Sequence, residues 1–497
     1  MRVHVTYIQQ EAPSSARSTT RWWTLPVVSL AQLMVVLDAT IVNIALPSAQ
    51  KSLGMTDADR HWVITAYALA FGGLLLLGGR VCSAIGHRRA FAVGLVGFGL
   101  TSGLGGAAGN AGTLVAARAG QGLFAALLAP AALSLLILTF TDGRERGKAF
   151  RVFAGVGAGG AALGVVAGGL LTKYADWRWC LYANIPMSAI ALIGIPLILR
   201  DRPGGNLRNL DLPGVLLSAA SLVSLVYGFT QAEPHGWGDA KVLALLVGGV
   251  LLLTLFVLVE SRTRNPLLPL RILVHRVRGT AFVSVCLMFA AMFGFYLFVS
   301  YYTQTILGYS PVKAGMTLLV NAVSTTVGAM LIAGRLSRRV APSTLIAGSL
   351  LSSAAGMLIL TQLKVDSTHV FPVYLTPAMI LTGIGLGCLL ATATNTATIE
   401  LDPAEAGVAS AAYNTVQQVG AAFGTALLNS IAAGVTTSYL KDHGNRPEAV
   451  NTGTVHGYTV ALWVAFGLLV GGALVVSLLS RGGRRPSRPT GVAEVSG

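Results

Sequence analysis

The sequence has few charged residues. Asp, Glu, Lys and Arg make up 11% of its 497 residues, against roughly 25% in an ordinary soluble domain. This deficit excludes a conventional soluble enzyme. The remaining charges are unbalanced, because 35 Lys and Arg outnumber 19 Asp and Glu and give a net charge of +16. In a soluble protein that excess would suggest a nucleic-acid partner, so the positions of the charges must decide.

Several catalytic and cofactor motifs are also missing. The string nearest to a Walker A loop, residues 143–149, has the wrong spacing, and the G-x-G-x-x-G match at 155–160 lies in an apolar stretch with no preceding strand. The sequence contains no H-E-x-x-H or G-x-S-x-G string. Its four cysteines are too widely spaced to indicate a metal site or a disulfide framework. We therefore predict that the chain is not an enzyme and uses no metal ion or cofactor.

Long stretches without any charge are what the sequence has in abundance. Thirteen stretches of 18 residues or more contain no Asp, Glu, Lys or Arg, and each is long enough to span a bilayer. A fourteenth apolar segment, residues 22–47, contains one charge, Asp38. Because lipid requires each span to satisfy its own backbone hydrogen bonds, the sequence predicts an all-α integral membrane protein with fourteen transmembrane helices.

The basic residues indicate the orientation of these helices. With both termini in the cytoplasm, the inner segments contain 25 Lys and Arg and the outer segments nine, while Arg118 lies within a span. The positive-inside rule favours this topology, which makes the net charge a membrane signal and excludes a nucleic-acid partner. We predict a multi-pass membrane protein with no cleaved signal peptide.

A weak internal repeat divides the chain. Leu53-Gly54 and Gly79-Arg80 recur as Leu307-Gly308 and Gly334-Arg335, at offsets of 254 and 255 residues. The shared offset predicts two six-helix halves in parallel orientation around an inserted pair, a 6+2+6 arrangement. The predicted parts are an N-terminal cytoplasmic tail (1–21), an N-terminal six-helix bundle (22–200), a two-helix insertion with an inner loop (201–277), a C-terminal six-helix bundle (278–480) and a C-terminal cytoplasmic tail (481–497).

Asp38 is the most informative single residue. An ionisable group within a span is costly and usually functional, and the helix rise places Asp38 and Arg118 at similar depths. One interpretation is a structural ion pair. The other is that Asp38 exchanges a proton, because desolvation favours its neutral form while Arg118 or a cationic substrate favours its charged form.

Other residues inside the spans are candidates for packing or for function. Glycines at positions 160, 164 and 168 form a smooth stripe, which indicates either close packing or a surface that allows helices to move past each other. Polar side chains in later spans bond between helices or line a cavity. The candidate cavity residues are Asn43, Tyr67, Gln121, Asn321, Asn414, Gln417 and Gln418.

Residues 37–47, Leu-Asp-Ala-Thr-Ile-Val-Asn-Ile-Ala-Leu-Pro, resemble the first-helix signature of the fourteen-helix drug:proton antiporters of the major facilitator superfamily. Further similar strings are residues 62–67, Arg-x-x-Gln-Gly at 118–122, the glycine stripe, and residues 177–186, 308–315 and 414–424. The chain is also similar to antibiotic self-resistance exporters of the puromycin and lincomycin type, which implies a location in the bacterial inner (plasma) membrane.

This resemblance implies that Asp38 and Arg118 take part in proton coupling and that other residues form gates. The implied gating residues are Gly79, Arg80, Ser83, Gly86, Arg88, Arg89, Gly160, Gly164, Gly168 and Gly169. The sequence departs from the family pattern at Ser83, where the family has Asp, and at Val165, where it usually has Pro. Because of these departures, the sequence does not decide whether the inner gate has a charge latch or whether the fifth helix has a kink.

We therefore expect a monomeric, proton-coupled exporter of a lipophilic drug or antibiotic, with the drug, protons and the lipid bilayer as its partners. Because Asp38 is the only acid well inside a span, we expect a monocationic, zwitterionic or neutral substrate. Two alternatives remain open: a proton symporter that takes up a small metabolite, and a membrane sensor or scaffold that transports nothing.

Overall fold

The computed structural model describes residues 21–481, except 56, 198–210, 264, 265, 267, 338, 399–404 and 445. Every element within these ranges is helical, as predicted. The predicted tails lie almost entirely outside the described residues, as do the end of the predicted N-terminal bundle (198–200) and the start of the predicted insertion (201–210).

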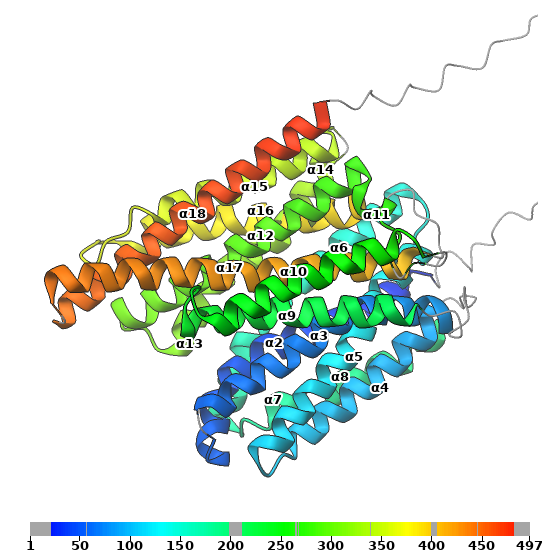
Figure 1. Cartoon of the computed structure of the whole chain (residues 1–497), viewed down its shortest axis with the longest axis horizontal. Helices are drawn as coiled ribbons and strands as arrows, with labels where there is room; N and C mark the ends of the chain where they lie inside the picture. The colour runs from blue at the N-terminus through cyan, green and yellow to red at the C-terminus, as the bar shows by residue number, and fades with distance from the viewer. Residues whose placement is uncertain are drawn as a thin grey trace, which may run out of the picture.

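The described helices form two groups joined by a pair (Figure 1). The first group comprises α2 (Thr24–Leu53), α3 (Asp57–Ile85), α4 (His87–Gly106), α5 (Ala111–Thr139), α6 (Gly143–Tyr174), α7 (Trp179–Tyr182), α8 (Asn184–Gly194) and η1 (Ile195–Leu197). The pair is α9 (Leu212–His235) and α10 (Ala240–Glu260), followed by the short α11 (Arg271–Val274). The second group comprises α12 (Arg276–Tyr301), η3 (Tyr302–Ile306), α13 (Pro311–Val327), η4 (Gly328–Ile332), α14 (Ala333–Leu336), α15 (Pro342–Leu360), η5 (Phe371–Leu375), α16 (Thr376–Ala397), α17 (Ala406–His443) and α18 (Pro447–Arg481).

Length and composition suit these helices to a bilayer. Ten of the described helices are long and apolar enough to cross a membrane, and Trp179–Gly194 and Pro213–Phe229 are shorter apolar helices. Their surfaces are mostly apolar, and their backbone N–H and C=O groups are bonded within each helix, so these helices can lie in lipid without unsatisfied polar groups. This pattern confirms an all-α membrane protein and is compatible with fourteen spans, a number that stays a prediction.

Polar caps fix where several helices begin. Asn110 accepts a hydrogen bond from the backbone N–H of Thr113 at the start of α5, and Asp142 caps α6 in the same way. Asp211 and Asp239 cap α9 and α10. Each cap satisfies an N–H that the helix itself leaves without a partner, so these short polar residues mark the points where the chain turns back toward the membrane.

The internal repeat has a counterpart in the backbone. Gly54, which follows α2, has a φ of 60°, and Gly308, which follows η3, has a φ of 64°. Side chains other than hydrogen are disfavoured in this left-handed region, so glycine suits both ends. Positions that the offset of 254 residues relates therefore end their helices in the same conformation. The predicted boundaries of the two bundles and the insertion stay predictions.

The pair α9–α10 lies across the two groups. Helix α9 contacts α3 of the first group and α17 of the second, while α10 packs against α9 (Figure 1). Aromatic rings make the contacts on both sides, with Trp62 of α3 stacked on Tyr227 at 5.9 Å and Phe423 of α17 against Phe229 at 5.4 Å. The insertion therefore covers one seam between the groups.

Candidate functional site

Asp38 lies near the middle of α2, fourteen residues after its first residue and fifteen before its last. Its side chain is 0% exposed, and its Oδ2 is 2.6 Å from Nη1 of Arg118 on α5, which is itself 3% exposed. The helix rise predicts similar depths for the two residues, and their contact agrees with it. Burying two charges is expensive unless they are paired and hydrogen-bonded, which they are here.

Two neutral side chains complete the hydrogen bonds of the Asp38 carboxylate. Nε2 of Gln121 donates to Oδ1 at 2.9 Å, and Nδ2 of Asn184 donates to the same oxygen at 2.8 Å. Asn184 also donates to Oγ of Ser102 on α4 at 2.9 Å. With Tyr67 of α3, which lies beside Arg118, the helices that meet α2 at this site are α3, α4, α5 and α8. The carboxylate is provided with donors suited to its ionised form.

Arg118 has several partners besides Asp38. Its Nε donates to the backbone oxygen of Val63 at 3.3 Å, and its Nη1 also donates to Oε1 of Gln121 at 3.0 Å. The guanidinium lies 4.3 Å from the centre of the Tyr67 ring, a favourable cation–π arrangement. The hydroxyl of Tyr67 is buried and has no hydrogen-bond partner among the described residues. Tyr67 and Gln121, predicted as cavity residues, therefore lie within the Asp38 site.

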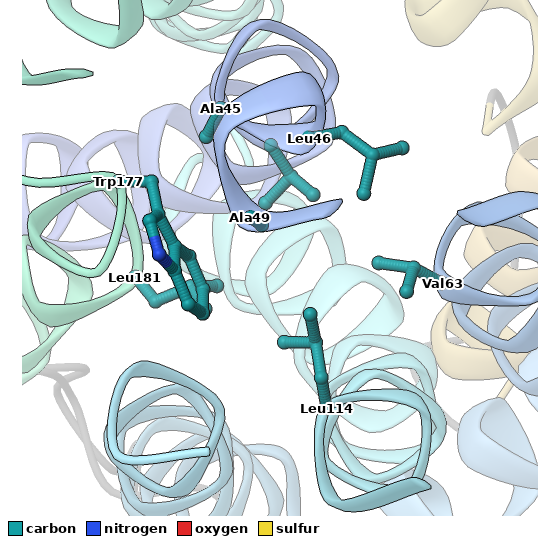
Figure 2. A pocket seen from close by; sticks show the side chains of 8 residues that line it. Ala45, Leu46, Ala49, Val63, Leu114, Trp177 and Leu181 are labelled. Carbon is teal, nitrogen blue, oxygen red and sulfur yellow. The ribbon is translucent and has the colours of Figure 1, made fainter. Parts of the chain in front are cut away.

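An apolar pocket lies on one side of this network (Figure 2). It is lined by Val42, Ala45, Leu46, Ala49, Val63, Leu114, Trp177 and Leu181. Val42 is one helical turn beyond Asp38 on α2, and Leu114 is one turn before Arg118 on α5. In Figure 2, Trp177 and Leu114 face the α2 side chains Ala45 and Ala49 across the pocket. These side chains keep the pair in a surrounding of low polarity, which strengthens its electrostatic attraction.

The remaining candidate cavity residues fall into three classes. Asn321 of α13 is 2% exposed and bonds between helices, donating to the Met379 backbone oxygen and to Oγ1 of Thr382. Asn414 donates to the backbone of its own helix and, like Gln417 and Gln418, is partly exposed on α17. The side chain of Asn43 lies outside the described residues. A substrate-binding role for these residues stays a prediction.

The two helix groups meet closely at the end where α3 and α5 finish and α6 begins, which we call the basic end after Arg80, Arg88 and Arg144. A Cβ added to Gly79 of α3 would lie 2.6 Å from the backbone oxygen of Gly407 on α17. Such spacing leaves no room for a side chain. The smallness of both glycines therefore allows α3 and α17 to touch through their backbones.

Ser83 is part of this contact. It is 7% exposed and donates to the backbone oxygen of Gly79 at 3.2 Å, and it lies beside Gly407. Gly86, with a φ of 93°, forms the turn into α4. Of the predicted gating cations, Arg80 and Arg88 are partly exposed and Arg89 is exposed.

Hydrogen bonds also join the groups toward the basic end. The Arg146 guanidinium on α6 donates to Oγ1 of Thr398 at 2.6 Å, and the hydroxyls of Ser134 and Ser410 are 3.4 Å apart. Burial lowers the pKa of Arg146, which is partly desolvated where it crosses to the second group. The structure is therefore closed at the basic end.

The glycine stripe of α6 packs within the first group. A Cβ on Gly164 would lie 1.9 Å from Oγ1 of Thr40 on α2, and one on Gly168 would lie 3.0 Å from Cγ1 of Ile41. Gly160 lies against Leu33 of α2. Helix α6 runs without a break from Gly143 to Tyr174 and contains no proline. The stripe thus brings α2 and α6 close together beside Asp38. A role in movement stays a prediction.

Sequence reasoning missed two members of the site, Asn184 and Ser102. Asn184 stood within the matched string at residues 177–186, so the resemblance carried a signal for it. Ser102 had none, because a serine within an apolar span gives no indication of what it faces until the helices are packed.

Comparison with known proteins agrees with this architecture. The Major Facilitator Superfamily profile matches residues 28–425. The chain is 54% identical to the puromycin resistance protein of Streptomyces alboniger over 96% of this chain and 94% of that protein. It is 36% identical to the cephamycin export protein of Amycolatopsis lactamdurans, covering 85% of this chain and 87% of that one. It is 32% identical to the lincomycin resistance protein of Streptomyces lincolnensis, covering 84% and 86%.

Solved structures show the same fold at low sequence identity. A proton:xylose symporter superposes with a TM-score of 0.59 at 16% identity, covering 90% of this chain and 95% of that one. A human organic anion transporter does so with a TM-score of 0.60 at 13% identity, covering 90% and 99%. The chain therefore belongs to the major facilitator superfamily and is a membrane transporter, not an enzyme.

Proposed function

We propose that this chain exports a lipophilic antibiotic from a bacterial cell in exchange for protons. Three similar proteins are named for antibiotic resistance or export, and one of them is similar along nearly the whole chain. The observation that carries the proton coupling is the buried pair of Asp38 and Arg118 in mid-span. An ionisable pair at this depth is the arrangement expected of a proton-transfer site.

The pair gives a simple account of coupling. The Asp38 carboxylate neutralises Arg118 while the proton is absent. When Asp38 takes up a proton, the Arg118 guanidinium loses its counter-charge in a site of low polarity. The ionised pair and the protonated pair are therefore stable in different surroundings. A substrate bound near the pair then competes with the proton through the same charges, which links binding of one to release of the other.

The membrane potential can drive this exchange. A potential of about 150 mV contributes roughly 3.5 kcal/mol for each proton that enters, at about 2.3 kcal/mol per 100 mV. At about 1.4 kcal/mol for each tenfold ratio, one proton supports a several-hundredfold gradient of a neutral drug. One membrane-embedded acid thus suffices for a neutral or zwitterionic substrate. A monocation exchanged for one proton moves no net charge, so its export depends on the pH gradient instead.

The positive-inside rule assigns the basic end to the cytoplasm, with both termini on that side. Closure at the basic end then corresponds to a transporter that is closed to the cytoplasm. Opening to the cytoplasm requires Gly79 to separate from Gly407 and Arg146 to leave Thr398. Ser83 takes the place of a charged latch, so in this chain the gate depends on close packing, on the contact between the hydroxyls of Ser134 and Ser410, and on the bond that Arg146 donates to Thr398.

Everted membrane vesicles from a pump-deficient host test the function. The vesicles are acidified inside and carry a pH-gradient dye, and puromycin is then added. We expect puromycin to dissipate the gradient with wild-type protein but not with Asp38→Asn, provided that both reach the membrane in equal amounts. Gradient loss that persists in Asp38→Asn would refute the role of Asp38. Puromycin uptake into cells driven by protons would instead favour a symporter.

Puromycin is the first probe because of the similarity to the puromycin resistance protein. A resistance profile against a panel of antibiotics in the same host extends the test to other substrates. If no compound is moved in proteoliposomes that hold an imposed proton gradient, the chain is not an exporter, and a sensor or scaffold role replaces the proposal.

A further inference from the structure

The two oxygens of the Asp38 carboxylate have different partners. Oδ2 faces the charged guanidinium of Arg118 at 2.6 Å. Oδ1 faces two neutral amides, Nε2 of Gln121 at 2.9 Å and Nδ2 of Asn184 at 2.8 Å. A carboxylate can accept all three bonds, but a protonated oxygen cannot donate to an N–H. The orientation of the two amides therefore decides which oxygen can bind a proton.

The orientation of the Asn184 amide is fixed from outside the pair. The backbone oxygen of Leu181 can only accept, so Oγ of Ser102, at 2.8 Å, must use its single proton to donate to it. Ser102 is then left as an acceptor for Asn184, at 2.9 Å. The nitrogen of the Asn184 side chain must accordingly point toward Ser102 and Asp38.

The oxygen of the same amide has no such role. Oδ1 of Asn184 is buried and has no hydrogen-bond partner among the described residues. A buried acceptor without a partner is unfavourable. An amide that merely tied two helices together would not need to leave its oxygen unpaired. The Asn184 side chain is therefore oriented so that its N–H groups donate to Asp38 and to Ser102.

Gln121 is fixed in a comparable way. Its Oε1 accepts from Nη1 of Arg118 at 3.0 Å, and a guanidinium offers only donors. Its nitrogen is thereby turned toward Asp38. Both amides present N–H groups to Oδ1 and neither can reverse without losing a bond to a fixed partner.

We propose that Asn184, held by Ser102, is a positioning residue that closes Oδ1 of Asp38 to protons, so that a proton binds at Oδ2 only when Arg118 leaves it. Protonation and the ion pair then exclude each other at one atom. This inference rests on the proposed proton coupling and adds the reason why a proton cannot bind while the pair remains intact.

Few other titratable groups face Asp38 in the described part of the chain. Arg118 comes from α5 and Tyr67 from α3, and α4 and α8 contribute the uncharged Ser102 and Asn184. On α6 the neighbours are the glycines of the stripe. The Cys180 thiol of α7 is turned to the Gly168 backbone oxygen of α6.

The test follows the protonation of Asp38 directly and needs no substrate. Purified full-length protein in lipid nanodiscs is titrated with pH while the infrared band of the protonated carboxyl group is recorded, and the band that Asp38→Asn lacks is assigned to Asp38. We expect Asn184→Ala to raise the midpoint of this titration by about one pH unit, a tenfold gain in proton affinity that equals about 1.4 kcal/mol. The cause is the loss of one donor to the ionised form and the opening of Oδ1 to the proton.

Two further variants keep the test decisive. Ser102→Ala removes the acceptor that fixes the amide, so we expect a smaller shift in the same direction, even if Asn184→Ala fails to fold. Ser188→Ala is the matched control, because its hydroxyl donates to Leu95 of α4 from the same helix as Asn184 without bonding Asp38. We expect its midpoint to equal that of the wild type.

The outcomes separate this inference from the proposed function. An unchanged midpoint in both Asn184→Ala and Ser102→Ala, or an equal shift in Ser188→Ala, overturns the role of Asn184 while leaving proton coupling by Asp38 intact. Drug-dependent proton movement that persists in Asp38→Asn overturns the proposed function, whatever the titration of Asn184 variants shows.

Discussion

Gly407→Ala is the change that most directly tests the closed gate at the basic end. The new methyl group would lie 2.6 Å from the backbone oxygen of Gly79 and 2.7 Å from Oγ of Ser83. A carbon needs roughly 3.5–4.0 Å from such neighbours, so α3 and α17 must separate by on the order of 1 Å. Forcing a methyl group into a packed contact costs about 1–3 kcal/mol. Since the cost applies only while the gate is closed, we expect the ratio of open to closed molecules to rise about 5- to 150-fold.

Cysteine labelling measures this shift. Ser410→Cys places a thiol at a position that is 0% exposed in the closed gate, in a background whose four native cysteines are replaced by alanine. Everted vesicles expose the basic end to a maleimide that cannot cross the membrane. We expect Gly407→Ala to speed the labelling of this thiol by at least severalfold.

Gly434→Ala is the matched control for the gate. It lies on the same helix, α17, and a Cβ there meets no atom within 4 Å. We expect it to label at the rate of the parent. Equal labelling of Gly407→Ala and the parent would refute the steric argument, and equal acceleration in Gly434→Ala would show that any alanine on α17 loosens the gate.

Three further changes test other parts of the site. Ser83→Asp places a carboxylate in the buried contact at the basic end, and separation of the two helix groups would hydrate it. We therefore expect faster labelling of the same gate thiol. An unaltered rate would show that a carboxylate at this position has no effect on gating. Gly164→Ala would bring a methyl group 1.9 Å from a threonine hydroxyl of α2, so we expect a loss of about 1–3 kcal/mol, seen as a lower melting temperature in detergent, whereas Gly159→Ala, with open space around it, should melt like the wild type. Arg118→Lys keeps the charge but cannot make all the bonds of the guanidinium fork; we expect drug-driven proton movement in vesicles to fall at least tenfold, and full activity would mean that charge alone suffices.

The sequence predicted the class of fold because bilayer physics leaves so little choice. Charge-free stretches of sufficient length must be helices in lipid, and the position of the basic residues indicates their orientation. The Leu-Gly repeat of the sequence also has a counterpart in the structure, since Gly54 and Gly308 both take the left-handed conformation. Helix ends were less predictable, because α17 continues from Ala406 to His443, well beyond what a membrane requires.

The site was only partly predictable. Helix rise alone placed Asp38 and Arg118 at one depth, but which neutral side chains face them depends on how each helix is rotated. That rotation is set by packing between segments far apart in the chain, such as Ser102 and Asn184. The same limit applies to Asn321, whose bonds to α16 give it a structural partner that sequence spacing could not reveal.

The position of α9 makes the two sides of the transporter unequal toward the surrounding lipid. On one side α9 packs against both α3 and α17, which also touch each other, and on the other α6 and α13 meet directly. A lipophilic molecule dissolved in a leaflet can approach the interior only where the helices can part laterally. Because α9 binds both of its neighbours through aromatic rings, we expect entry from the lipid to be confined to the side of α6 and α13. An antibiotic would then be taken from the bilayer through a single lateral opening, and substitutions along that opening would alter resistance to hydrophobic drugs more than to hydrophilic ones.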